Sequence, residues 1–189
     1  MAGIFETSSN ILRIPIPLRI VAGEWRGRTI KAPPGSNVRP TRDRIREAWM
    51  SIVHPYLPGA NVLDLCAGSG ALGIEALSRG ATLAEFVDNS PESITVLKTN
   101  LKTLAATSRA IVHKADAAAF VKRLPERAFG VAFADPPYAT DMAISLANCW
   151  LHLPYAVILG IEHSSTITMP PGGDTRRYGT SSITFYRAG

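Results

Sequence analysis

The sequence predicts an α/β fold, a doubly wound and mostly parallel sheet preceded by a small N-terminal hairpin and helix. Three observations predict this class. Short apolar segments of strand length alternate with segments of helical spacing. Four of those strands end at or just before an aspartate, and a glycine-rich turn follows the first of them. The length of 189 residues fits one domain of ordinary globular composition, 46% hydrophobic and 19% charged.

Three regions are expected in chain order: a flexible leader (1–17), a basic extension made of a hairpin and a helix (18–58), and the main domain (59–189). Residues 19–31 have the pattern of two short strands around a turn at Gly23 or nearby. Thr41 is predicted to cap a helix that ends before Pro55, because apolar residues follow it at helical spacing.

Five apolar segments of the main domain have the character of buried parallel strands: 61–65, 84–88, 110–114, 130–135 and 156–162. Helical segments separate them, and the one that begins near Ser90 carries a cap and a proline in its first turn. The last strand, 182–187, is expected to pair with residues 177–178 across a turn at Gly179.

Composition excludes several classes of protein. No apolar run approaches the roughly 18 residues of a membrane span, and the first residues lack the features of a signal peptide. We therefore expect a monomeric, cytoplasmic protein without a membrane partner. Cys66 and Cys149 have no metal-binding or redox spacing, so we expect two reduced thiols and no metal site.

The net charge of +5 is concentrated near the N-terminus. Residues 19–46 contain eight arginines and lysines against two acidic residues, so this segment carries +6 and the rest of the chain about −1. A basic segment next to a near-neutral body favours a polyanionic partner. A solvated surface has the same composition, so charge alone leaves both interpretations open.

The glycine-rich turn predicts a nucleotide-type cofactor. The spacing G-x-G-x-x-G over 68–73 lets the backbone approach a ligand at a helix N-terminus, for NAD as well as for S-adenosylmethionine. Asp64 lies where a carboxylate can face an ammonium group, and Asp88 and Asp116 are placed for ribose hydroxyls and an adenine amine. No basic residue lies near the turn before Arg79 to neutralise a pyrophosphate, which favours S-adenosylmethionine. The predicted cofactor-binding residues are Asp64, Ala67, Gly68, Ser69, Gly70, Asp88, Asn89, Asp116, Ala117 and Asp135.

The segment Asp135-Pro136-Pro137-Tyr138 ends the fourth strand and predicts the reacting end of the site. Its prolines stiffen the loop, hold Asp135 in an extended backbone and cannot donate hydrogen bonds. An exocyclic base amine is a weak nucleophile, and acceptors on its two N–H bonds free its lone pair. We expect Asp135 and the Pro136 carbonyl to accept those bonds and Tyr138 to stack on the base. Asp135 is also expected to take the released proton, and the four residues form the predicted catalytic set.

Each of these signals has a structural alternative. Asp, Pro and Tyr are common in strand-ending turns, and an aspartate at a strand end often caps the next helix. Trp25 and Trp49 are expected in the core, and His113 and His163 are expected to be structural because no nucleophile accompanies them. Neither cysteine follows a proline, so the Pro-Cys nucleophile of pyrimidine-C5 methyltransferases is missing and the predicted attack is on nitrogen.

Five stretches of the sequence resemble the bacterial RsmD-type family, class I methyltransferases that modify N2 of a guanine in 16S ribosomal RNA. The stretches are 19–28, 39–48, 64–73, 75–81 and 135–138. The resemblance covers about residues 18–187. Cys66 departs from the usual Phe, Asp88 from the frequent Glu, and Thr180 from the usual Asp.

The resemblance implies a seven-stranded sheet, S-adenosylmethionine as methyl donor, and the small ribosomal subunit or its assembly intermediate as substrate. It further implies RNA contacts from the N-terminal region, in agreement with the basic segment. The implied RNA-binding residues are Arg26, Arg28, Arg39, Thr41, Arg42 and Arg44.

Three functions remain open from the sequence. The first is the guanine-N2 methyltransferase of 16S rRNA. The second is a DNA methyltransferase acting on adenine N6 or cytosine N4, which shares the Asp-Pro-Pro-Tyr motif, although 189 residues show no separate recognition domain. The third is an NAD-dependent oxidoreductase, because the glycine spacing is common to both cofactors.

Overall fold

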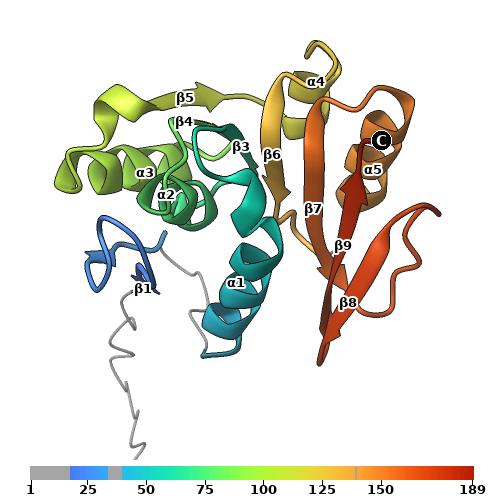
Figure 1. The fold of residues 1–189 in the computed structure, drawn as a ribbon, viewed down its shortest axis with the longest axis horizontal. Helices are drawn as coiled ribbons and strands as arrows, with labels where there is room; N and C mark the ends of the chain where they lie inside the picture. Colours follow the sequence, from blue (N-terminus) through green and yellow to red (C-terminus); the bar gives the residue numbers. More distant parts are fainter. Residues whose placement is uncertain (1–17, 34–39, 139) are drawn as a thin grey trace, which may run out of the picture.

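The computed structural model describes residues 18–33, 40–138 and 140–189, with the side chains of 40–43 left aside. Its centre is a seven-stranded sheet with helices on both faces (Figure 1). The strands of this sheet are β3 (Asn61–Leu65), β4 (Leu83–Asp88), β5 (Ala110–Lys114), β6 (Phe129–Ala134), β7 (Ala156–Ser164), β8 (Asp174–Tyr178) and β9 (Ser181–Arg187). The helices are α1 (Pro40–Val53), α2 (Ala71–Ser78), α3 (Pro91–Thr103), α4 (Ala117–Val121) and α5 (Met142–His152), with 3-10 turns at His54–Tyr56 and Thr107–Arg109.

The strand order β5-β4-β3-β6-β7-β9-β8 confirms the predicted doubly wound sheet. The strands from β5 to β7 are parallel, and β9 lies antiparallel between β7 and β8 as the C-terminal pattern predicts. After β3 the chain adds β4 and β5 on one side of it. The chain then crosses back and adds β6 on the other side of β3. The carboxyl ends of β3 and β6 therefore form the switch point, where sheets of this class bind ligands.

Two apolar clusters cover the two faces of the sheet. The N-terminal segment and helices α1 to α3 cover one face, where Trp49 stands edge-on against Phe133 at 5.9 Å between ring centroids. Helices α4 and α5 cover the other face around Trp150 and Leu146. Burial on both sides explains why the central strands β3, β6 and β7 are nearly continuous apolar runs.

The N-terminal hairpin is shorter than the sequence pattern suggests. Strands β1 (Leu18–Arg19) and β2 (Thr29–Ile30) pair antiparallel, and the long loop between them packs on α2. Gly23 has φ +82° and a Cβ there would lie 1.7 Å from the carbonyl oxygen of Ser78, so only glycine fits this contact. Trp25 is buried, as predicted, beneath the Arg109 guanidinium at 5.3 Å.

Hydrogen bonds fasten this loop to the main domain. The Glu75 carboxylate, only 1% exposed, accepts bonds from the backbone N–H groups of Val21 and Ala22 at 2.9 and 3.0 Å. The Asn100 amide accepts from Lys31 N–H and donates to the carbonyls of Lys31 and Ser69. The hairpin therefore shares its packing with the sheet, and the domain boundary at residue 58 stays a prediction.

Helix α1 begins two residues earlier than predicted, since a cap at Thr41 would make residue 42 the first helical one. Pro40 is already helical, so the expectation that Thr41 caps the helix was wrong. Proline suits a first helical position because its missing N–H has no intrahelical partner to find there. The predicted end before Pro55 is confirmed, since α1 stops at Val53.

The remaining residues singled out as structural are accounted for by local contacts. The His113 ring lies 2.7 Å from a Glu85 oxygen, and the buried His163 ring contacts the Ser164 carbonyl and the Thr184 hydroxyl. Both cysteines are free thiols. None of the helices in the described part of the chain is long and apolar enough to cross a membrane.

Candidate active site

A cavity of about 610 Å³ opens at the carboxyl edge of the sheet, beside the switch point. It gathers residues from the ends of β3, β4, β6 and β7, from the loop after β5 and from α1. The predicted site residues that line it are Asp64, Ala67, Gly68, Ser69, Asp88, Asn89, Ala117, Asp135, Pro136, Pro137 and Tyr138. Gly70 and Asp116 are the predicted cofactor residues that do not line it.

The glycine-rich turn connects β3 to α2 and positions Asp64. The backbone N–H of Gly73 donates a 2.8 Å bond to Oδ2 of Asp64. A Cβ on Gly73 would lie 2.4 Å from the Phe86 ring, so glycine is required for the close approach of α2 to β4. Among the described residues no hydrogen-bond donor reaches Oδ1 of Asp64, which leaves this oxygen for a ligand.

The cavity has a negative electrostatic character. Asp64 is 2% exposed, and burial raises its pKa well above the ordinary value; the Gly73 N–H bond opposes this rise, and Asp135 and Asp88 add to it. Among the described lining residues Arg46 carries the one positive side chain. A ligand with a positive charge relieves the repulsion between these carboxylates. The cavity therefore fits the positively charged sulfonium and ammonium groups of S-adenosylmethionine.

Asp88 links the end of β4 to the glycine turn. Its Oδ2 accepts a bond from Gly68 N–H and its Oδ1 accepts one from Ser90 N–H, both at 2.8 Å. Each carboxylate oxygen has a second lone pair that can accept a bond from a ribose hydroxyl. The expected contact with the ribose stays a prediction.

Asp116 is an exposed N-cap of α4. Its Oδ1 accepts a 2.8 Å bond from Ala119 N–H, as the structural alternative for such aspartates expects. Ala115 and Ala117 line the cavity on either side of it. The role of Asp116 toward an adenine amine stays a prediction, with one carboxylate oxygen already used for capping.

The loop after β6 presents acceptors to the cavity. The Pro137 carbonyl is occupied, because it accepts a 2.9 Å bond from the Thr140 hydroxyl. No donor among the described residues reaches the carbonyl of Pro136, which lines the cavity next to Asp135. The pair predicted to accept the two N–H bonds of an amine is thus present at the cavity wall.

Tyr138 is fixed by its hydroxyl group. This hydroxyl donates a short bond to Oε1 of Glu162 and lies 2.6 Å from the Ser181 hydroxyl. Burial and the bond with Glu162 raise the pKa of Tyr138, so the phenol stays neutral and its ring stays oriented. The side chain is 44% exposed, which leaves part of the ring open to a ligand.

Sequence reasoning missed two charged residues of the cavity, Glu162 and Arg46. Glu162 ends the fifth predicted strand in the same manner as the aspartates end theirs, so the rule that found Asp135 also points to it. Arg46 was counted only as part of the basic segment. It is buried, and its guanidinium donates a 2.6 Å bond to the Arg19 carbonyl, a partner that no local pattern identifies.

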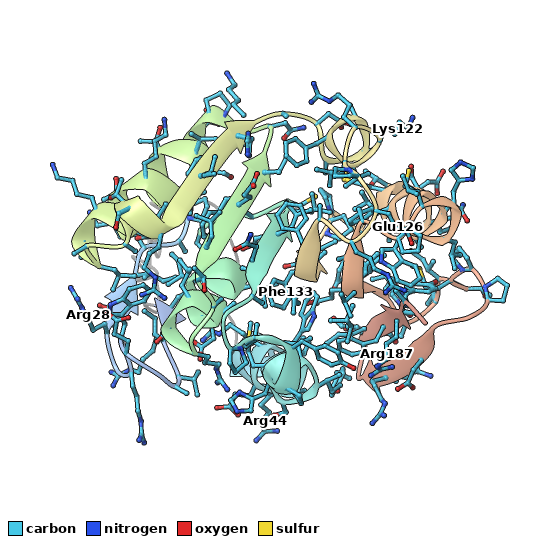
Figure 2. All side chains as sticks on the ribbon, turned by 45° about the horizontal axis from the view of Figure 1, so that its top comes forward. Arg28, Arg44, Lys122, Glu126, Phe133 and Arg187 are labelled. Carbon is cyan, nitrogen blue, oxygen red and sulfur yellow. The ribbon has the colours of Figure 1, made fainter. Side chains whose placement is uncertain are left out.

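The expected RNA-binding residues lie outside the cavity. Arg26, Arg28 and Arg44 are exposed, and Figure 2 shows Arg28 and Arg44 on the N-terminal hairpin and α1. The Arg28 guanidinium donates a 2.6 Å bond to the Thr103 carbonyl, which uses part of its donor capacity. Arg39 lies outside the described residues. Thr41 and Arg42 lie in α1, but their side chains are not among those described.

The strand order, the cavity at the switch point and the similarity to named methyltransferases identify a class I, S-adenosylmethionine-dependent methyltransferase. Within that class, the chain belongs to the family described as Conserved hypothetical protein 95, whose model matches residues 18–187.

One relative of known sequence and one of known structure align with this chain over nearly their whole length. The Ribosomal RNA small subunit methyltransferase D of Haemophilus influenzae is 34% identical over 177 residues, covering 90% of this chain and 92% of its own. The hypothetical protein TTHA0928 of Thermus thermophilus has 31% sequence identity to this chain, and its structure superposes with a TM-score of 0.77. The alignment covers 90% of this chain and 99% of that one.

A second structure shares the fold alone. The Thermus thermophilus 16S rRNA N2 G1207 methyltransferase (RsmC), solved in complex with AdoMet and guanosine, is 19% identical with a TM-score of 0.72. The alignment covers 92% of this chain and 50% of that one.

Proposed function

We propose that the protein transfers a methyl group from S-adenosylmethionine to the exocyclic N2 of a guanine in 16S rRNA, acting as a monomer on the small subunit or its assembly intermediate. The observation that carries the proposal is that Asp135 and Pro136 both line the cavity, where the Pro136 carbonyl accepts no bond from the described residues. The names of the relatives support the substrate class.

When bound, S-adenosylmethionine supplies an electrophilic methyl group on its sulfonium. We assign the binding of its charged end to Asp64, which lines the cavity and uses only Oδ2 for the glycine turn. Asp88 and the backbone of residues 67–69 hold the sugar, and the loop around Ala117 holds the adenine. The glycine turn, fixed to β4 through Asp88, keeps this surface rigid before the ligand arrives.

The residues after β6 act on the amine. Asp135 and the Pro136 carbonyl accept its two N–H bonds, so the nitrogen lone pair turns toward the methyl group. Bound S-adenosylmethionine would supply the methyl group to N2 and keep the sulfur electron pair, and Asp135 would take the proton that N2 loses. Tyr138 stacks on the base, and a paired base must leave its stack before it reaches this wall.

The basic N-terminal segment is the proposed RNA contact. Arg26, Arg28, Arg39, Arg42 and Arg44, with Thr41, are assigned to phosphates or to the approach of the target. Exposure of Arg26 and Arg44 supports this assignment. Such contacts position the RNA without specifying the base, which is left to the cavity.

The test is methyl transfer from labelled S-adenosylmethionine to small subunits that lack the modification, with naked 16S rRNA and duplex DNA in parallel reactions. Digestion to nucleosides should recover N2-methylguanosine from the RNA, and primer extension would map the position. Label on DNA as N6-methyladenine or N4-methylcytosine would transfer the proposal to the DNA class. Binding of NAD with no affinity for S-adenosylmethionine would overturn it altogether.

A further inference from the structure

Glu162 lies beside Asp135 at the carboxyl edge of the sheet. Ala134 of β6 is in register with Ile161 of β7, so the next residue of each strand, Asp135 and Glu162, are neighbours in adjacent parallel chains. Both residues line the cavity. Two carboxylates from different strands therefore stand at the wall where the amine is proposed to react.

The two oxygens of Glu162 have different surroundings. Oε1 accepts the bond from the Tyr138 hydroxyl, and the Ser181 hydroxyl is in turn placed to donate to the tyrosine oxygen. For Oε2 no donor is found among the described residues. The side chain is only 7% exposed and the residue lines the cavity, so a ligand bound there can supply the donor that Oε2 lacks.

Guanine has a donor edge that matches this arrangement. Its N2 amine and its N1–H are adjacent donors, whereas the amino groups of adenine and cytosine stand next to a ring nitrogen that is an acceptor. An acceptor placed beside Asp135 therefore attracts guanine and repels the lone pair of the other two bases. The Tyr138 hydroxyl occupies Oε1, so the bond to the base is assigned to Oε2.

We propose that Glu162 determines the specificity of the site for guanine by accepting the N1–H of the target base through Oε2, next to the N2 amine held by Asp135. This inference rests on the proposed function, and adds to it the residue that selects the base.

The experiment compares two substrates at the mapped position. Small subunits are reconstituted with 16S rRNA that carries either guanosine or 2-aminopurine riboside there; the analogue keeps the 2-amino group but has an acceptor at N1. We expect wild-type kcat/KM to be lower on the analogue by about 100-fold or more. In Glu162→Gln the amide can donate to N1, and the preference for guanosine should shrink to about tenfold or less.

The control separates base recognition from the positioning of Tyr138. Tyr138→Phe removes the hydrogen bond to Glu162 and keeps the carboxylate, so it should retain most of the guanosine preference even where kcat falls. If Tyr138→Phe and Glu162→Gln lose the preference equally, Glu162 acts through the tyrosine and the inference is overturned.

Other outcomes are also decisive. An unchanged preference in Glu162→Gln contradicts the inference, and so does a wild-type enzyme that methylates both substrates equally, a result independent of any variant's folding. Cofactor binding by calorimetry shows that each variant is folded. Absence of N2-methylguanosine with the wild-type enzyme would instead count against the proposed function itself.

Discussion

The backbone N–H of Gly73 donates a 2.8 Å hydrogen bond to Oδ2 of Asp64, so the first turn of α2 holds the carboxylate that β3 delivers to the cavity. The first turn of a helix has unpaired N–H groups and a positive dipole end, both of which favour an anion. Here they do not offset burial, because the pKa of Asp64 is still raised well above its ordinary value.

We predict that Asp64→Asn stabilises the free protein and removes cofactor binding. With a raised folded-state pKa, the folded protein retains a proton that the unfolded chain releases, so stability is greatest below the ordinary pKa and falls as pH rises toward the folded-state value. The neutral amide avoids this loss and still accepts from Gly73. The variant should melt at a higher temperature than wild type at pH 8, with the difference shrinking toward pH 4.

Thermal unfolding followed by circular dichroism across that pH range measures the stability effect, and calorimetry with S-adenosylmethionine measures the binding effect. A variant that melts lower than wild type at every pH would contradict the electrostatic argument.

Asp135→Ala should lower kcat for methyl transfer by about 10²–10³-fold, because one acceptor for the amine is lost. Affinity for S-adenosylmethionine should change far less. Asp135→Asn retains an acceptor oxygen but takes no proton, so its kcat should fall between wild type and Asp135→Ala. Single-turnover transfer to the small subunit gives the rates, and equal turnover by Asp135→Ala would disprove the mechanism.

Glu75→Ala should detach the N-terminal loop from α2. The substitution leaves the Val21 and Ala22 N–H groups and the Arg79 guanidinium without their buried acceptor, at a cost of about 3 kcal/mol in the free energy of unfolding. Urea unfolding measures this value. The matched control is Glu126→Ala, an exposed acid paired at 3.9 Å, which should change stability by less than about 0.5 kcal/mol.

Arg44→Glu should weaken RNA binding and reduce its salt dependence. Each lost phosphate contact lowers the slope of log affinity against log salt by about 0.9 for a duplex and somewhat less for a single strand. Lys122→Glu makes the same charge change at an exposed position at the end of α4, across the sheet from α1 (Figure 2). Filter binding at several salt concentrations should separate the two variants; equal losses would mean that net charge alone governs affinity.

The sequence by itself determined the sheet, the switch point and three of the acidic residues of the cavity wall. Strand periodicity and the breaks at glycine and proline are local properties, and parallel strands must meet at one edge, so Asp64, Asp88 and Asp135 could be placed together before any coordinates. The same rule extends to Glu162, which ends the fifth predicted strand.

Only the tertiary structure decided how those side chains are used. The raised pKa of Asp64 comes from burial and neighbouring charges, and the capping by Asp116 comes from the orientation of one carboxylate. The bond from Arg46 to Arg19 and the bonds from Val21 and Ala22 to Glu75 join residues 27 to 54 positions apart. Hydrogen bonds and burial depend on distances in space, and a sequence pattern carries information only about neighbours along the chain.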